Sequence, residues 1–122
     1  MKEKILIIDD KILNMKLASD LLEHHGYSVI KAFNAEDGIS ALQKELPHLI
    51  LLDLTLPDID GFEVYRRIRS QEQYNNIKIV AFTATSNIDK ELISFGFDDV
   101  IYKPIDTRSF VSTIKKIFAH NN

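Results

Sequence analysis

Short aliphatic runs that alternate with longer amphipathic segments are the feature of this sequence that most restricts its fold. Two runs, residues 5–8 and 49–52, are continuously aliphatic, which is typical of strands buried on both faces of a parallel sheet. Residues 77–82 and 100–102 fit the same pattern, and residues 28–32 fit a more exposed strand. Strands that alternate with helices predict a parallel sheet covered by helices on both faces.

Helical patterns fill the intervals between these strands. In the first, apolar residues from Ile12 to Leu22 recur at three- and four-residue spacing, and Gly26 follows where a helix C-cap belongs. The second pattern has Asn34 as its expected N-cap and stops before Pro47. These signals place two helices between the first three strands.

Three more helical patterns complete the chain. One contains Val64 and Ile68, another ends before Gly96, and the last follows an expected N-cap at Asp106. Right-handed crossovers between the strands then favour the flavodoxin-like strand order 2-1-3-4-5. The expected fold class is therefore α/β, a doubly wound (βα)5 domain with a five-stranded parallel sheet.

The size and composition of the chain agree with one domain. Its 122 residues are expected to form a single domain, 1–122, with a core at about 4–118. The 18 acidic residues outnumber the 15 basic ones, which argues against a nucleic-acid partner. Cysteine is absent, which excludes disulfides and thiolate chemistry, and no apolar run approaches the roughly 18 residues of a membrane span. We expect a cytoplasmic protein with no membrane partner.

Polar residues end the predicted strands. Asp9 and Asp10 follow the first strand, Asp53 the third, Thr83 the fourth and Lys103 the fifth. Since ligands of open α/β sheets bind outside the carboxyl ends of the strands, at the point where the strand order reverses, we expect these five side chains to converge.

The three carboxylates predict either a trapped proton or a bound hard cation. A like-charged pair 4 Å apart costs about 4 kcal/mol at an effective dielectric of about 20. Carboxylate oxygens that leave room for water suit Mg²⁺, and the hydroxyl of Thr83 with the ammonium of Lys103 suits a phosphoryl group. A carboxylate beside the metal can act as the nucleophile and form an aspartyl phosphate.

Four motifs in this order carry a family resemblance. They are Ile8-Asp9-Asp10, the segment from Leu52 through Asp53 to Gly61, Phe82-Thr83-Ala84 and Tyr102-Lys103-Pro104. Together they resemble the receiver (CheY-like) domain of two-component response regulators over residues 4–118.

The resemblance implies a role for each site residue. Asp53 is the phosphoacceptor, and Mg²⁺, with Mn²⁺ as a substitute, is bound by Asp9, Asp10, Asp53 and the backbone carbonyl of Thr55. Thr83 and Lys103 bind the phosphoryl oxygens, and Thr83 acts with Tyr102 as a switch. The resemblance also implies a cis peptide bond between Lys103 and Pro104.

Partners follow from the same resemblance. They are a sensor histidine kinase or a histidine phosphotransfer protein, and a downstream protein target. The protein is expected to catalyse only its own phosphorylation and dephosphorylation, to turn over no metabolite, and to be a monomer, with a phosphorylation-dependent dimer as the alternative.

Two other functions are consistent with parts of the sequence. A haloacid-dehalogenase-like phosphatase also uses an Asp nucleophile after a hydrophobic strand, but it requires a second acid where this chain has Thr55. A phosphorylation-independent docking module is the other alternative.

Some features depart from the family pattern or carry no expected chemistry. Lys11 places a cation beside the acidic pair, and only 20 positions separate Thr83 from Lys103, which predicts a shortened fourth helix or leading loop. Asp58 and Asp60 are interpreted as loop-turn residues and Asp98-Asp99 as a turn or cap. The cluster Arg66, Arg67 and Arg69 is interpreted as solvated helix charge.

Overall fold

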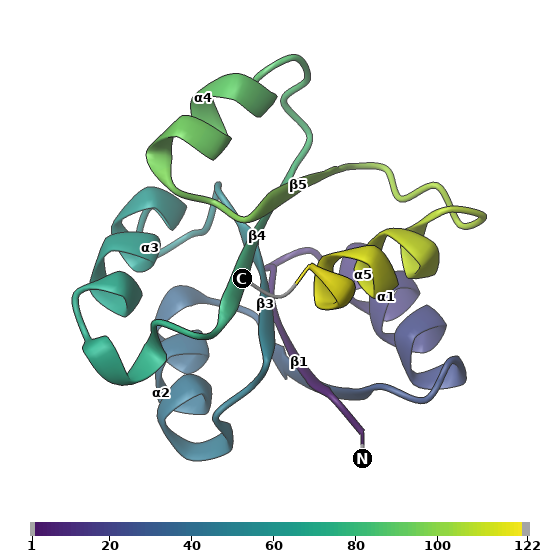
Figure 1. The fold of residues 1–122 in the computed structure, drawn as a ribbon, viewed down its shortest axis with the longest axis horizontal. Helices are drawn as coiled ribbons and strands as arrows, with labels where there is room; N and C mark the ends of the chain where they lie inside the picture. The colour runs from purple at the N-terminus through teal and green to yellow at the C-terminus, as the bar shows by residue number, and fades with distance from the viewer. Residues whose placement is uncertain (1, 121–122) are drawn as a thin grey trace.

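A five-stranded parallel sheet in the order β2-β1-β3-β4-β5 forms the centre of the computed structural model, which describes residues 2–120 (Figure 1). The strands are β1 (Lys4–Ile8), β2 (Ser28–Ala32), β3 (Leu49–Asp53), β4 (Lys78–Thr83) and β5 (Asp99–Tyr102). The order and the parallel pairing confirm the predicted fold class. β2 is the most exposed strand, as its sequence indicates.

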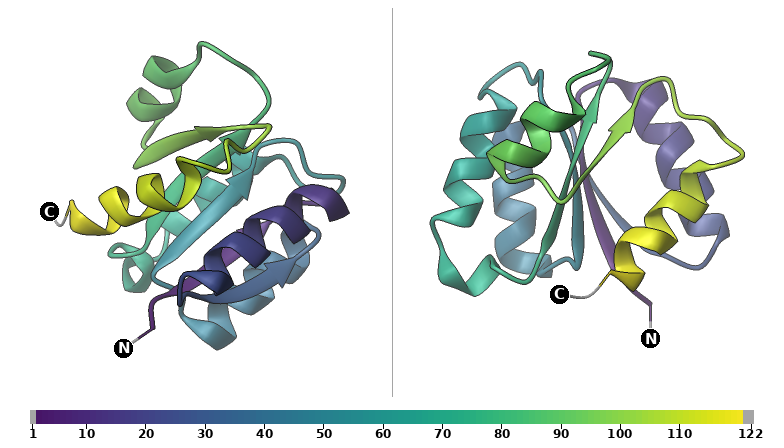
Figure 2. Two further views of the ribbon diagram at one scale, coloured as in Figure 1. Left: turned by 90° about the vertical axis from the view of Figure 1, so that its right-hand side faces the viewer. Right: turned by 45° about the horizontal axis from the view of Figure 1, so that its top comes forward.

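The helices cover both faces of the sheet. They are α1 (Ile12–His24), α2 (Ala35–Glu45), α3 (Gly61–Arg69), α4 (Asp89–Phe95) and α5 (Phe110–Ala119), with a short 3₁₀ helix η1 (Glu72–Tyr74) that the sequence did not predict. α1 and α5 lie on one face, and α2, α3 and α4 on the other (Figures 1 and 2). Within residues 2–120 no helix has both the length and the apolar character that a bilayer crossing requires.

Each face of the sheet has its own apolar core. Leu6 and Ile8 of β1 point toward α2 and α3, whereas Ile5 and Ile7 point toward α1 and α5. Because successive strand residues point to opposite faces, a strand covered on both sides must be apolar throughout. The aliphatic runs of the sequence therefore supply both cores at once.

The ends of α1 and α2 follow their sequence signals. Asn34 accepts a hydrogen bond from Asp37 N at 2.8 Å, as expected of an N-cap. Gly26, after α1, has a φ of +94°, which glycine adopts without steric penalty. α2 ends with Leu46 in the left-handed region, directly before Pro47.

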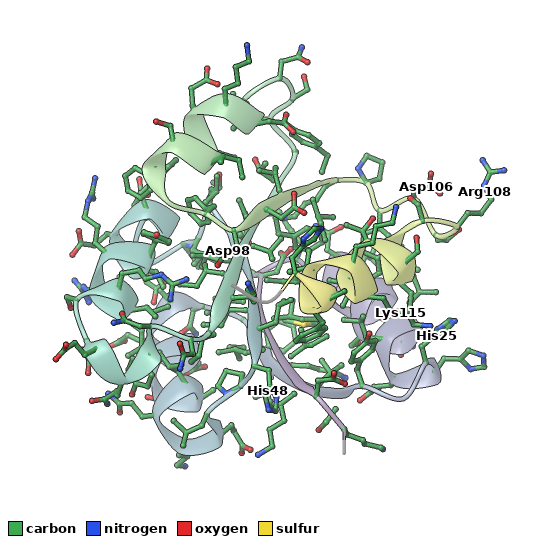
Figure 3. The ribbon with its side chains drawn as sticks, viewed as in Figure 1. His25, His48, Asp98, Asp106, Arg108 and Lys115 are labelled. Atoms are coloured by element: carbon green, nitrogen blue, oxygen red, sulfur yellow. The ribbon has the colours of Figure 1, made fainter. Side chains whose placement is uncertain are left out.

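The prediction for the start of α5 was wrong. Asp106 does not cap the helix, which begins at Phe110 after Ser109. Instead the Asp106 carboxylate accepts from Arg108 N at 3.0 Å, and its carbonyl accepts from Phe110 N at 3.0 Å. These bonds form a turn in the loop that carries Asp106 and Arg108 into α5 (Figure 3). A turn and a helix start share this Asp signal, because both use a carboxylate to bind a nearby backbone N–H.

The fourth helix is short, as the spacing from Thr83 to Lys103 predicts. α4 has 7 residues and ends at Phe95, directly before Gly96, where φ is +138°. A Cβ at Gly96 would lie 2.1 Å from the hydroxyl of Tyr65, so any other residue here would force the Tyr65 side chain to move and would adopt a backbone conformation that favours glycine.

Candidate functional site

The three predicted acidic residues meet at the carboxyl edge of the sheet. Asp9 and Asp10 follow β1 and Asp53 ends β3, and these neighbouring strands pair Ile8 with Leu52. One carboxylate oxygen of each residue lies within 4.8 Å of the others. Asp9 is fully buried and Asp53 is 5% exposed, so water screens their repulsion poorly.

Lys103 supplies the nearest positive charge. Its Nζ lies 2.8 Å from Asp9 Oδ2 and 3.2 Å from Asp53 Oδ2, and it sits 4.7 Å from the centre of the Phe82 ring. The backbone N of Lys103 donates to the carbonyl of Thr83 at 2.8 Å, which extends the β4–β5 ladder past Tyr102. The Lys103–Pro104 peptide bond is cis, the form that the resemblance implies. One ammonium thus contacts two of the three carboxylates.

Backbone N–H groups fix the remaining oxygens of Asp9 and Asp53. Lys11 N donates to Asp9 Oδ1 at 2.8 Å, and Thr55 N donates to Asp53 Oδ1 at 3.0 Å. Burial raises the pKa of Asp53, and the Asp9 charge raises it further, whereas the Thr55 N–H and Lys103 act in the opposite direction. The net direction is upward, so the lysine and the N–H do not fully offset the loss of water around this carboxylate.

Asp10 is the least satisfied member of the cluster. Its Oδ2 lies 3.2 Å from Lys11 Nζ, but its Oδ1 is buried and has no hydrogen-bond partner among the residues that the structure describes. Asp9 Oδ2 also lacks a hydrogen bond, because its contact with Lys103 is an ion pair outside hydrogen-bond geometry. Two buried oxygens without hydrogen-bond donors, in a cluster of three carboxylates, fit a hard divalent cation such as Mg²⁺.

A cavity of about 200 Å³ opens beside this cluster. Its lining includes Asp53, Thr55, Thr83, Lys103 and Lys11. A larger hollow of about 360 Å³ lies at the opposite edge of the sheet, next to His48 and Lys78, and contains none of the predicted site residues. The smaller cavity is the one in which the carboxylate of Asp53, the hydroxyl of Thr83 and the ammonium group of Lys103 meet, and such convergent polar groups orient a small ligand.

Thr83 and Tyr102 are neighbours across the β4–β5 ladder. Thr83 is buried and its Oγ1 accepts a hydrogen bond from Thr85 N at 3.1 Å. The half-buried Tyr102 hydroxyl donates to the Asp89 carboxylate and accepts from Ile88 N at 3.3 Å. The hydrogen bond to Asp89 raises the pKa of Tyr102. The phenol is therefore held at the start of α4, and Tyr102 does not line the Asp53 cavity.

Two loop aspartates act as caps. Asp58 accepts from Ala35 N at 2.9 Å and from Glu36 N at 3.0 Å, so it caps α2 from a different loop. The hydrogen bond from Ala35 N, and to a lesser extent that from Glu36 N, lowers the pKa of Asp58. Asp60 is the N-cap of α3 and accepts from Phe62 N at 2.7 Å. The sequence predicted that both aspartates bond to nearby backbone in a turn. Asp58 instead accepts a hydrogen bond from a residue 23 positions away in the sequence.

Sequence reasoning missed Asp89 as the partner of Tyr102. Asp89 is exposed at the start of α4, and its contact with Tyr102 depends on where α4 lies against β5. No local pattern in the sequence indicates such a pair.

The acidic cluster and its lysines lie at the switch point of a doubly wound sheet, which is where the ligands of such folds bind. The chain matches the response regulator receiver domain family over residues 5–115. It is 35% identical over 117 residues to the polar-differentiation response regulator DivK of Brucella anthropi, covering 94% of this chain and 95% of that protein. The chain belongs to the response regulator receiver family.

Solved structures agree with this assignment. The chemotaxis response regulator CheY4 of Vibrio cholerae is similar with a TM-score of 0.89 and 25% identity, covering 96% of this chain and 99% of that one. A two-component response regulator from Clostridium difficile gives a TM-score of 0.87 and 28% identity, with 98% of both chains covered. The protein is thus a receiver of two-component signalling, a family whose members interact with histidine kinases and downstream targets.

Proposed function

We propose that Asp53 accepts a phosphoryl group from a phosphohistidine donor. The observation that carries this assignment is the position of the Asp53 carboxylate. It lines the cavity, lies 3.2 Å from the Lys103 ammonium and is grouped with Asp9 and Asp10. Of the three carboxylates, only that of Asp53 lines the cavity where a donor would enter.

The transfer replaces one bond to phosphorus by another. A carboxylate oxygen of Asp53 forms an O–P bond while the N–P bond of the phosphohistidine breaks, and the electron pair of that bond returns to the imidazole of the donor. Lys103 and the hydroxyl of Thr83 bind the phosphoryl oxygens, whose negative charge they offset. Hydrolysis of the same acyl phosphate by water returns Asp53 to its free form.

Receivers of this family bind Mg²⁺ in an acidic pocket, and the cluster found here fits that role. Asp9, Asp10 and Asp53 are the proposed side-chain ligands, the carbonyl of Thr55 completes the protein set, and Mn²⁺ is the expected substitute. When bound, the ion supplies positive charge that offsets both the carboxylates and the phosphoryl oxygens.

The proposed output is a change of protein-interaction surface. Phosphorylated Asp53 favours the arrangement in which Thr83 donates to the phosphoryl group, and Tyr102 then moves from its place beside Asp89. Phosphohistidine donors are a sensor kinase or a histidine phosphotransfer protein, and the partner downstream is a protein. A cytoplasmic, monomeric protein that acts on no metabolite is part of this proposal.

The two alternative functions have weaker support. A haloacid-dehalogenase-like phosphatase needs a second acid two residues after the nucleophile, and Thr55 offers only its exposed hydroxyl and its backbone there. A phosphorylation-independent docking module leaves the buried, partly unpartnered carboxylates unexplained.

The test is phosphorylation by a small acyl phosphate. Incubation with acetyl phosphate and Mg²⁺ should add one phosphoryl group, measured by intact mass, and Asp53→Asn should abolish the addition. Asp98→Asn, a matched change at the opposite edge of the sheet, should label like wild type. Equal labelling of Asp53→Asn and wild type would show that another residue is the acceptor.

A further inference from the structure

We propose that Lys11 is a tethered counter-cation of the acidic cluster. It pairs with Asp10 while no metal is bound, leaves that carboxylate when a divalent cation arrives, and then contacts the phosphoryl anion. This inference rests on the proposed function of Asp53 and adds a residue outside the set that the family resemblance implies.

The two lysines of the site differ in how firmly they are held. The Lys103 side chain is 11% exposed and its ammonium contacts both Asp9 and Asp53. The Lys11 side chain is 68% exposed and its ammonium contacts Asp10 alone, at 3.2 Å. Lys103 is thus a half-buried part of the site, whereas Lys11 can leave its carboxylate without losing a buried contact.

The backbone holds the base of the Lys11 side chain in place. Lys11 N donates to Asp9 Oδ1 at 2.8 Å, and its carbonyl accepts from Met15 N at 3.0 Å in the first turn of α1. Its side chain makes no capping bond to the helix. The flexible four-carbon stem therefore starts from a fixed point and is free of any structural role in α1.

Lys11 adjoins both proposed ligand positions. Lys11 contacts Asp10 of the acidic cluster, and it also lines the cavity that holds Asp53, Thr83 and Lys103. A positive charge at this position competes with a metal cation for Asp10 and attracts an anion that enters the cavity.

Charge then predicts opposite effects on two ligands. The three carboxylates and two lysines carry one net negative charge, and without Lys11 they carry two. Removal of Lys11 should strengthen the binding of a cation and weaken the binding of an anion. A purely structural role would change both affinities in the same direction.

The experiment compares Lys11→Ala with Lys16→Ala. Lys16 lies on α1 and pairs with Asp20 at 2.9 Å, so its removal changes the net charge equally but outside the site. We expect Lys11→Ala to bind Mg²⁺ about two- to fivefold more tightly than wild type, which corresponds to the free energy of an exposed ion pair. The Mg²⁺ affinity of Lys16→Ala should be nearly unchanged. Calorimetric titration of the metal-free protein measures this affinity without reference to activity.

Beryllofluoride, a phosphoryl mimic, provides the second measurement. At saturating Mg²⁺, we expect Lys11→Ala to bind it about two- to fivefold more weakly than wild type or Lys16→Ala. Both differences should shrink in high salt, since the pair is exposed and therefore screened. Lys11→Gln, which keeps the stem, should behave like Lys11→Ala.

The outcomes separate this inference from the proposed function. Equal Mg²⁺ affinity in the Lys11 and Lys16 variants overturns the role of Lys11 as a counter-cation, and equal beryllofluoride affinity overturns its contact with the phosphoryl group. Weaker binding of both ligands by Lys11→Ala assigns Lys11 a structural role instead. If wild type binds neither ligand while the protein is folded, the proposed function fails, and the Lys11 inference fails with it.

Discussion

The two edges of the sheet both carry a carboxylate paired with a basic side chain, but only one pairing is complete. At the amino edge, Arg69 lies 3.1 Å from Asp98 Oδ2 and donates to the carbonyls of Tyr74 and Ile77 at 3.0 and 2.8 Å. Ile79 N donates to the same Asp98 oxygen at 2.8 Å. Figure 3 shows Asp98 where the chain enters β5.

At the carboxyl edge, three carboxylates share the half-buried Lys103 and the exposed Lys11, and a buried oxygen of Asp10 has no donor within residues 2–120. A polar network in which every group has a partner stabilises a fold. A network with unpaired buried groups lowers stability, and those groups can bind a ligand. The contrast teaches that an acidic residue beside a base indicates function only where the charges do not balance.

The largest expected effect is that of Lys103→Met. This change leaves the buried Asp9 and Asp53 carboxylates without their cation, and loss of one partner of a buried ion pair costs about 3–5 kcal/mol. Urea unfolding without metal should show this loss, and millimolar Mg²⁺ should recover part of it by binding the native state. Lys103→Arg, which keeps the charge, serves as the control. Wild-type stability in metal-free Lys103→Met would contradict the electrostatic account of this edge.

The matching change at the amino edge is Arg69→Met. It removes a partly exposed ion pair and two bonds to carbonyls, so the free energy of unfolding should fall by about 1–2 kcal/mol. Mg²⁺ should raise the stability of this variant as much as that of wild type, because the metal site is intact. A specific failure of Mg²⁺ to stabilise Arg69→Met would mean that the two edges are coupled.

Removal of a carboxylate should raise the stability of the metal-free protein at the carboxyl edge and lower it at the amino edge. The pKa of Asp53 is raised in the folded protein, so its favourable contribution is present below its unfolded value and is lost as pH rises through the folded value. At neutral pH the ionised group therefore destabilises the metal-free fold, and Asp53→Asn should have a higher melting temperature than wild type.

The gain of Asp53→Asn should shrink toward pH 4, where the wild-type carboxyl carries its proton for more of the time. Asp98→Asn should lose stability at neutral pH, since Asp98 accepts from both Arg69 and Ile79 N. Thermal melts of both variants across this pH range measure the two signs. A loss of stability in both would remove the distinction between the edges.

The smallest expected effect concerns Tyr102→Phe. The change removes the acceptor of Ile88 N and the donor to Asp89, and Ile88 provides no side-chain cap for α4. Amide hydrogen exchange in the first turn of α4 should speed up by about two- to fivefold, with α5 unchanged as an internal control. Unchanged exchange in α4 would show that the phenol does not hold this helix.

Local chemistry made much of this molecule predictable. The aliphatic runs predicted the strands, because a strand covered on both sides has few alternatives to continuous apolar residues. The convergence of Asp9, Asp53 and Lys103 followed from the strand order, which places the carboxyl ends of β1, β3 and β5 on one edge.

The errors concern side chains whose sequence pattern is compatible with more than one partner. The three arginines of α3 were all interpreted as solvated helix charge. This interpretation agrees with the exposed pairs that Arg66 and Arg67 form with Glu63. It was wrong for Arg69, which donates to η1 and to Asp98. Asp106 carries the signal of an N-cap but forms a turn before α5. In each case the side chain has several possible partners nearby, and the fold selects one.

The sequence by itself determined the fold class, the strand order and the identity of the charged residues at the carboxyl edge, because apolar periodicity and strand-end position are properties of contiguous residues. Only the tertiary structure decided that Lys103 contacts Asp9 and Asp53, that Lys11 alone pairs with Asp10, and that Asp89 holds Tyr102. The physical reason is that an ion pair or a hydrogen bond depends on distances of about 3 Å between side chains, which the packing of separate elements sets.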